Sequence, residues 1–205
     1  CRRAVRENIE AGSDWSKLTV SGSGRESGGR AGAAPIMLAD EIAAASEAAR
    51  VAGKPVSAHA HSTAAINAAL AAGVRTIEHG TYFEAESVRL FKQRGAYLVP
   101  TASVAHFVRS QAQMFAGGRD GKSQEELKQW ADAAVANPGR AWRAGIPLAL
   151  GTDGGPSFEA DTTAREIGLY VDSGVPAAAA IAWPAVRNMM FWYPYSVRND
   201  ELGTR

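Results

Sequence analysis

The sequence predicts an α/β fold built on a parallel β-sheet, and three observations support this prediction. Stretches that suit a helix end at a glycine five times along the chain, at Gly12, Gly53, Gly73, Gly95 and Gly145. A glycine just past a helix end accepts the left-handed conformation that closes the helix. Each of these glycines is followed by a short apolar or β-branched run, as a strand requires. Strands that alternate with helices indicate βαβ units and therefore a parallel sheet.

The predicted elements follow this alternating order along the chain. After a helical stretch at the start, strands are predicted at residues 17–20, 56–58, 76–77, 97–99 and 148–150. The spacing of apolar side chains predicts helices at residues 36–51, 63–72, 84–94, 124–136, 161–173 and 176–188. Residues 106–123 include three glycines and are predicted to form a loop excursion before the helix at 124–136.

The composition limits the classes of function. A chain of 205 residues with 46% hydrophobic and 21% charged residues suits one globular domain. A net charge of +1 gives no reason to expect nucleic acid or a membrane surface as a partner. No apolar run approaches the length of about 18 residues that a membrane span needs. The single cysteine, Cys1, excludes an internal disulfide and a cysteine-based zinc site in this chain. We expect a small-molecule substrate and leave a homo-oligomer open.

The start of the chain suggests that residues are missing before it. Residue 1 is Cys1 rather than methionine, and the sequence opens directly inside a helical pattern. The lack of a signal peptide therefore carries no information about the compartment. The localisation stays undecided, with a slight preference for the cytoplasm.

Four polar side chains occupy equivalent places in the successive repeats. The offset from the preceding helix-ending glycine is five residues for Lys17, six for His59 and His79, and eight for Asp153. Each of these residues therefore falls at the carboxyl end of a predicted strand. Active sites of parallel barrels and open α/β sheets assemble at that edge. The sequence predicts that these four side chains converge.

Two imidazoles and a carboxylate suit a divalent metal ion, with zinc as the first choice and one or two ions possible in number. Such an ion would activate water as the nucleophile, and Asp153 is predicted to bind the metal and to act as the general base. Either histidine alone would be assigned to the core or the surface. Because His59, His79 and Asp153 share one register, we predict that they are metal ligands.

Lys17 has two interpretations. A strand lysine is most often a surface or salt-bridged residue. At a strand end lined by metal ligands, however, its neutral amine can add CO₂ and form a carbamate, which would act as a carboxylate-like bridging ligand. The sequence analysis counts Lys17 among the candidate metal ligands.

Three further side chains are predicted to line the substrate pocket: His61, Tyr82 and His106. His61 follows His59 by two residues, so on a strand both side chains face the same way. Because His61 falls where the strand should end, pocket lining is favoured over metal ligation. His106 stands alone, which favours a core or surface role. Arg109 could bind a substrate carboxylate, although a surface role is favoured for it as well.

Four segments together resemble the amidohydrolase superfamily. They are SAHAH at residues 57–61, AAGVRTIEHG at 71–80, GTDGG at 151–155 and SDWSKL at 13–18. The branch that they resemble contains the imidazolonepropionase-related and Xaa-Pro-dipeptidase-like (prolidase-like) enzymes. The resemblance implies that Lys17 is the carboxylated lysine of strand four, and that His59, His79 and Asp153 are the ligands of strands five, six and eight. It also implies hydrolysis of an amide-type bond in a cyclic amide, a dipeptide or a carbamate.

The resemblance places the whole chain, residues 1–205, in one partial (β/α)₈ TIM-type barrel domain. A complete barrel has about 250 residues, and only strands four to eight can be assigned here. No His-x-His motif precedes Lys17, so the first strands and their metal ligands are absent, as is the flanking β-sandwich. We therefore expect a fragment of a larger enzyme.

Two other functions compete with a hydrolase. An incomplete amidohydrolase could act without catalysis, as a metal-binding protein, a subunit or a scaffold. A phosphate or nucleotide could bind the glycine-rich loop from Ser21 to Gly29. That loop lacks the G-x-G-x-x-G spacing, and the next helix begins several residues later, so this third function is the least favoured.

Overall fold

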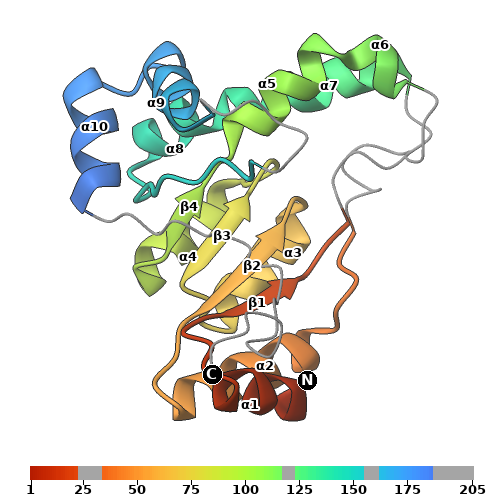
Figure 1. Cartoon of the computed structure of the whole chain (residues 1–205), viewed down its shortest axis with the longest axis vertical. Helices are drawn as coiled ribbons and strands as arrows, with labels where there is room; N and C mark the ends of the chain where they lie inside the picture. The colour runs from red at the N-terminus through yellow and green to blue at the C-terminus, as the bar shows by residue number, and fades with distance from the viewer. Residues whose placement is uncertain (23–33, 117–122, 155–161, 187–205) are drawn as a thin grey trace, which may run out of the picture.

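The computed structural model describes residues 1–22, 34–116, 123–154 and 162–186. Its centre is a sheet of four strands, β1 (Ser16–Thr19), β2 (Val56–Ala60), β3 (Thr76–His79) and β4 (Tyr97–Val99). They pair in the order β1-β2-β3-β4, and each pair is parallel. The predicted α/β class with a parallel sheet is therefore confirmed in the described part of the chain (Figure 1).

The fifth predicted strand, at residues 148–150, is only partly formed. Leu148 makes a single parallel bridge with Leu98 of β4. The Leu98 N–H donates to the Pro147 carbonyl and the Ala149 N–H donates to the Leu98 carbonyl, each at 2.9 Å. Pro147 has no N–H to donate, which limits the ladder at this place. The segment nevertheless extends the sheet beside β4.

Ten helices accompany the strands in the described ranges. They are α1 (Arg2–Glu10), α2 (Ala39–Val51), α3 (Thr63–Ala71), α4 (Ala85–Arg94), α5 (Ala102–Ser110), α6 (Ala112–Phe115), α7 (Gln124–Val135), α8 (Asn137–Ala144), α9 (Thr162–Asp172) and α10 (Ala177–Val186). The six helices predicted between residues 36 and 188 are present, with ends that differ by up to three residues. In Figure 1, α1 and α2 lie at one end of the molecule and α5 to α7 lie at the other.

The predicted loop excursion at residues 106–123 is wrong in part. Residues 102–110 form α5 and residues 112–115 form α6, while 117–122 lie outside the described residues. The glycines suggested a loop, but α5 is stabilised by tertiary packing that local sequence does not reveal. Its Ala105 and Val108 are buried in one cluster with Leu127, Trp130 and Ala131 of α7. Burial of an amphipathic face outweighs weak local propensity in this way.

The main hydrophobic core lies between the sheet and α2, α3 and α4. Its large side chains without exposed surface include Ile42, Ile66, Leu70, Ile77 and Leu98. Many of the other core side chains are alanines, which let the helices approach the strands closely. This packing fixes the strands, and therefore the residues that follow them, in a rigid arrangement.

The register of the sheet aligns the carboxyl ends of its strands. Lys17 lies opposite Ser57, His59 lies opposite Glu78, and Ala60 lies opposite His79. Neighbours in register point to the same face of a sheet. Alternation along the strands therefore places Lys17, His59 and Glu78 on one face and His79, opposite Ala60, on the other.

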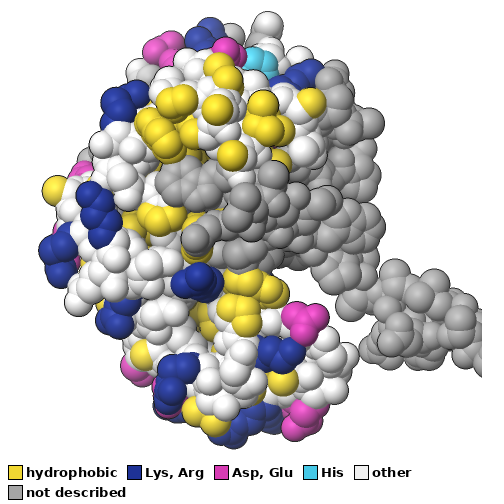
Figure 2. Space-filling view, turned by 90° about the vertical axis from the view of Figure 1, so that its left-hand side faces the viewer, with side chains coloured by type: hydrophobic (Ala, Val, Ile, Leu, Met, Phe, Trp, Pro, Cys, Tyr) yellow, Lys and Arg dark blue, Asp and Glu magenta, His cyan; other side chains and the backbone are white. Residues whose placement is uncertain are grey.

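On the face shown in Figure 2, Lys and Arg side chains are dispersed, with Asp and Glu among them. Apolar side chains gather over α9 and α10, where Val171 is 39% and Ile181 is 60% exposed. Within the described ranges, no helix is both long enough and apolar enough to cross a membrane.

Candidate metal centre

Three histidine rings meet at the carboxyl edge of the sheet. His59 lies in β2, His61 directly follows it, and His79 ends β3. One ring nitrogen of each lies within 4.8 Å of those of the other two. The rings of His61 and His79 stack with centroids 4.6 Å apart, and the His59 ring meets both edge-on. Such a set of imidazoles fits a divalent ion that prefers nitrogen ligands.

The hydrogen bonds of His79 fix which of its ring nitrogens carries the proton. Its Nδ1 lies 2.6 Å from the Thr101 hydroxyl oxygen. That hydroxyl donates its own hydrogen to the Pro100 carbonyl at 2.7 Å, so it must accept from His79. His79 therefore carries its proton on Nδ1 and presents an unprotonated Nε2 when the ring is neutral. Metal-ligating histidines are oriented by this kind of bond from the other nitrogen.

The other two rings are also held by polar neighbours. The Nε2 of His59 lies 3.1 Å from the Gly22 carbonyl, which can only accept, so in the neutral ring its Nδ1 is unprotonated. The Nδ1 of His61 lies 2.7 Å from the Thr81 hydroxyl, and the residue is 2% exposed. The sequence analysis favoured pocket lining for His61. The structure makes it a third candidate ligand.

Lys17 points to the same edge and contacts a residue that the sequence analysis missed. Its ammonium nitrogen forms an ion pair with the Glu78 carboxylate, whose other oxygen accepts from the Thr76 hydroxyl at 2.7 Å. Burial raises the pKa of Glu78 above its ordinary range, an effect that Lys17 and Thr76 oppose and the charge of Asp153 reinforces. The buried Ser57 hydroxyl, in register with Lys17, has no hydrogen-bond partner in the described part of the chain.

Asp153 completes the group around a small cavity of about 30 Å³. The cavity is lined by Lys17, Glu78, His79, Val99, Thr101, Gly151 and Asp153. Its volume suffices for a water molecule or an ion of that size. His79 lines this cavity and also belongs to the histidine cluster. The structure thus brings together all four predicted ligands, in two adjoining groups that share His79.

Backbone strain is concentrated around the same cavity. Within the described ranges, the non-glycine residues with positive φ are His79 at 68°, Thr101 at 52° and Asp153 at 50°. All three line the cavity. This conformation costs on the order of 1–3 kcal/mol per residue and persists where surrounding contacts impose it, which is most often at functional sites. The strained backbone turns these side chains toward one another.

Contacts from α8 stabilise the unusual backbone at the end of β3. The Asn137 side-chain amide is fully buried and donates to the carbonyls of His79 and Gly80, at 3.3 and 3.2 Å. Gly80 also has a positive φ, 56°, and a Cβ at this position would collide with the Leu98 side chain. Only glycine fits here, and the chain can therefore leave the strand with His79 facing the cavity.

The remaining predicted residues lie in different places. Tyr82 is adjacent to the cluster, and its N–H donates to the His61 carbonyl at 3.0 Å. His106 and Arg109 line a separate cavity with Lys128 and Asp132, between α5 and α7. Arg109 forms an ion pair there with Asp132 at 3.0 Å, in agreement with the surface role that was favoured.

Only the first two residues of the glycine-rich loop fall within the described part of the chain. Residues 23–29 of the proposed phosphate loop lie outside the described residues. Its first residue, Ser21, is fully buried and accepts the His61 N–H at 2.9 Å while donating to the Gly22 carbonyl at 2.8 Å. Ser21 and Gly22 therefore support the backbone of His61 and the ring of His59, respectively.

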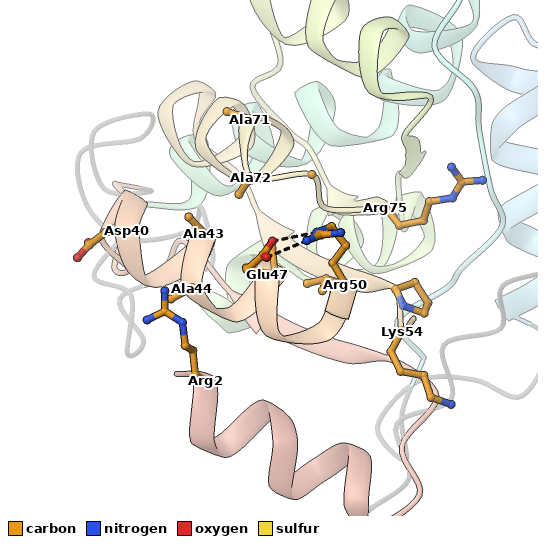
Figure 3. A pocket seen from close by; sticks show the side chains of 14 residues that line it. Arg2, Asp40, Ala43, Ala44, Glu47, Arg50, Lys54, Ala71, Ala72 and Arg75 are labelled. Carbon is orange, nitrogen blue, oxygen red and sulfur yellow. Dashed lines mark hydrogen bonds and ion pairs between the residues drawn. The ribbon is translucent and has the colours of Figure 1, made fainter. Parts of the chain in front are cut away.

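A larger cavity, of about 690 Å³, lies at the opposite, amino-terminal edge of the sheet. Figure 3 shows alanines of α2 and α3 at its wall and the pair formed by Glu47 and Arg50 at its centre. These two side chains are 53% and 71% exposed, and two hydrogen bonds of 2.9 and 2.8 Å join them. Lys54 is paired with Asp14 at 2.7 Å. Exposed, mutually neutralised pairs of this kind bind little on their own.

Comparison with known proteins gives one matching family and several similar structures. Residues 1–191 match the family model described as the amidohydrolase family. The ochratoxinase of Aspergillus niger is 33% identical over 174 residues, which cover 84% of this chain and 35% of that protein. Its crystal structure matches with a TM-score of 0.75 at 30% identity, over 89% of this chain and 40% of that chain.

Two other solved structures are similar over almost the same region. A Xaa-Pro dipeptidase with methionine bound in its active site matches with a TM-score of 0.75 at 30% identity, over 88% of this chain and 44% of that one. A putative prolidase from Bifidobacterium longum matches with a TM-score of 0.72 at 29% identity, over 90% of this chain and 46% of that one. The present chain spans less than half the length of each of these proteins.

Proposed function

This chain belongs to the amidohydrolase family, and we propose that it serves a metal-dependent hydrolase that cleaves an amide-type C–N bond in a small molecule. The observation that carries the proposal is the meeting of three imidazoles, Lys17 and Asp153 at one sheet edge. The fit to a metal is chemical: the hydrogen bonds leave one unprotonated nitrogen on neutral His59 and one on neutral His79. A bound divalent ion, with zinc as the first choice, would supply Lewis acidity for attack by water.

In this proposal the residues have distinct tasks. His59, His61 and His79 would hold the ion, and Thr101 and Thr81 keep two of their rings in place. Asp153 would be a further ligand, and its carboxylate would accept a proton from the attacking water and give it to the leaving amine. Glu78 holds the Lys17 side chain at the cavity. His61 and Tyr82 lie where they can also contact a substrate.

Lys17 is the candidate for carbamate formation. The unprotonated amine would attack CO₂, forming an N–C bond and releasing one proton, and the product would be an anionic ligand beside His79. The proposal is supported by the place of Lys17 at the cavity and by the unpartnered Ser57 hydroxyl next to it. Carbon-13 NMR in labelled bicarbonate would show a carbamate signal that is absent from Lys17→Met.

The substrate class is proposed from chemistry and from the relatives together. Cyclic amides, dipeptides and carbamates all contain a carbonyl that a Lewis acid polarises and a nitrogen leaving group that needs a proton. Dipeptides with a carboxyl-terminal proline are the first to test, because a Xaa-Pro dipeptidase matches this chain over 88% of its length.

Metal content with matched variants tests the proposal. We expect stoichiometric zinc in the purified protein, and its loss in His59→Ala and His79→Ala. Arg50→Ala, at the opposite edge of the sheet, should retain the metal. Hydrolysis of a panel of Xaa-Pro dipeptides and N-carbamoyl amino acids is then measured with zinc, manganese and cobalt.

Two outcomes would contradict the hydrolase. Equal metal content in the wild type and the three variants would show that the histidine cluster does not bind the metal. Specific zinc binding without turnover of any amide would instead support the competing function, a metal-binding subunit or scaffold built on an incomplete barrel.

A further inference from the structure

Helix α9 carries two fully buried polar side chains, one helical turn apart, that no step of the proposed reaction uses. Glu166 has no exposed surface and Tyr170 is 1% exposed. Residues four positions apart lie on the same face of a helix. Both side chains reach across to the backbone of segments that line the small cavity. Burying polar groups is costly unless they are hydrogen-bonded, so these contacts explain their position.

Glu166 satisfies the first turn of α5. One carboxylate oxygen accepts the Ala102 N–H at 2.8 Å and the other accepts the Ser103 N–H at 2.7 Å. The first N–H groups of a helix have no partner within the helix and are normally capped by the side chain of the residue that precedes it. A carboxylate at this end is also favoured by the helix dipole. Glu166 thus supplies a cap from a distant part of the sequence.

The residue that would ordinarily cap α5 is Thr101, and it makes no side-chain capping bond. Its hydroxyl instead donates to the Pro100 carbonyl and accepts the Nδ1 proton of His79. The positive φ of Thr101, rare for a β-branched residue, turns the side chain toward the cavity. The hydroxyl gives its one hydrogen to Pro100 and accepts from His79, while the first N–H groups of α5 are taken by Glu166.

We propose that Glu166 is a positioning residue for His79: by capping α5 in place of Thr101, it leaves the Thr101 hydroxyl to hold the His79 imidazole with Nε2 facing the metal site. This inference rests on the proposed function in naming what Nε2 faces, but the orientation of His79 can be measured without a metal. Glu166 acts through Thr101 and touches neither the ion nor the substrate.

Tyr170 serves the other side of the same cavity. Its hydroxyl donates to the Ala149 carbonyl at 2.8 Å, four residues before Asp153. The two contacts from α9 therefore hold separate segments, one leading to Thr101 and one leading to Asp153. This separation offers an internal control, because losing the Tyr170 contact should leave His79 unchanged.

The test compares four α9 variants by nitrogen-15 NMR of the histidine rings in metal-free protein, with His79→Ala identifying the signal of His79. In the wild type we expect a single neutral form of His79, protonated on Nδ1. Glu166→Leu removes both acceptors, so Thr101 turns to cap α5 and His79 becomes a mixture of the two neutral forms. Glu166→Gln, which retains one acceptor, should lie between them. Tyr170→Phe and Leu169→Ala, a buried apolar truncation on the same helix, should resemble the wild type.

Zinc affinity gives the second readout. Loss of a contact that orients a ligand typically weakens metal binding about 10–100-fold, which we expect for Glu166→Leu and not for Leu169→Ala. Unchanged His79 signals in Glu166→Leu would overturn the inference, as would an equal change in Leu169→Ala. If the wild type bound no zinc while Glu166→Leu still altered His79, the proposed function would fail and the positioning role would stand. If the wild type bound zinc tightly and Glu166→Leu changed neither the zinc affinity nor the His79 signals, the positioning role would fail and the proposed function would stand.

Discussion

The two edges of the sheet offer opposite kinds of cavity. The amino-terminal edge has the larger one, about 690 Å³, lined by alanines and by exposed charges that neutralise one another. The carboxyl edge has about 30 Å³ beside three histidines, with a buried Glu78 and three strained backbones. Cavity volume alone would select the amino-terminal edge as the functional site. The carboxyl edge is instead distinguished by several buried polar groups that converge on one small cavity, as polar groups do at binding and active sites.

The direction of the chain explains the difference between the edges. In a parallel sheet with crossover helices, helices begin at the carboxyl edge and end at the amino edge. Basic residues in the last turns of α2 and α4, Arg50, Lys92 and Arg94, lie at the negative ends of their helix dipoles. Stabilisation of these helix ends is therefore sufficient to explain why the three charged residues lie at this edge. At the other edge, side chains such as Ser62 and Glu166 cap the helix starts, and the loops before the helices can aim side chains inward.

The largest expected contrast between the edges is catalytic. Asp153→Asn should lower kcat about 10²–10⁴-fold, the usual contribution of a positioned general base. Asp40→Asn, which changes an aspartate that lines the amino-edge cavity, should leave kcat unchanged. Steady-state kinetics on whichever dipeptide is turned over, with metal content measured in parallel, makes the comparison. Equal rates for the two variants would show that Asp153 is not the base.

A smaller contrast concerns stability. Glu78→Gln breaks a buried pair with Lys17 and leaves polar groups without partners, so we expect the free energy of unfolding to fall by about 1–3 kcal/mol. Lys17 is 30% exposed at its side chain, and solvent screening limits the loss. Glu47→Gln, in the exposed pair at the amino edge, should produce no resolvable change. Urea denaturation of both variants tests this, and an equal loss in the two would contradict the assigned burial.

The third expected effect is a pH dependence of stability that originates near the carboxyl edge. Burial raises the pKa of Glu166 from 4.5 to about 7, although bonds from Ser103 and Ala102 oppose the shift. A raised folded-state pKa means that the stabilisation is complete below pH 4.5 and is lost as the pH rises through 7. The wild type should therefore lose up to about 3 kcal/mol relative to Glu166→Gln between pH 5 and pH 8. Denaturation curves at several pH values would contradict this if the wild type gained stability instead.

Sequence reasoning reached the strands and the predicted ligands because both follow from local signals. The helix-ending glycines set the offsets of Lys17, His59 and His79, and Asp153 follows the fifth predicted strand. Glu78 could not be found in the same way. Alternation along a strand places Glu78 and His79 on opposite faces, but the positive φ of His79 breaks the alternation and brings both to the cavity.

The same local signals could not predict contacts between segments that are far apart in the sequence. Thr101 and Glu166 carry no local motif, and Glu166 meets the start of α5 only because α9 packs against it. A loop was expected from residue 106 onward, whereas residues 106–110 belong to α5, which is buried against α7. His61 was expected to line the pocket, since strand ends cannot be placed to one residue from sequence. These features depend on tertiary structure.

X-ray absorption spectroscopy of the zinc-loaded protein tests the central claim most directly. A centre held by His59, His61 and His79 predicts two or three imidazole nitrogens at about 2.0–2.1 Å from zinc. The imidazole contribution should fall in His59→Ala and in His79→Ala, and it should persist in Arg50→Ala. A zinc shell of oxygen ligands alone, or one that stays the same in all of these variants, would contradict a metal centre at the carboxyl edge.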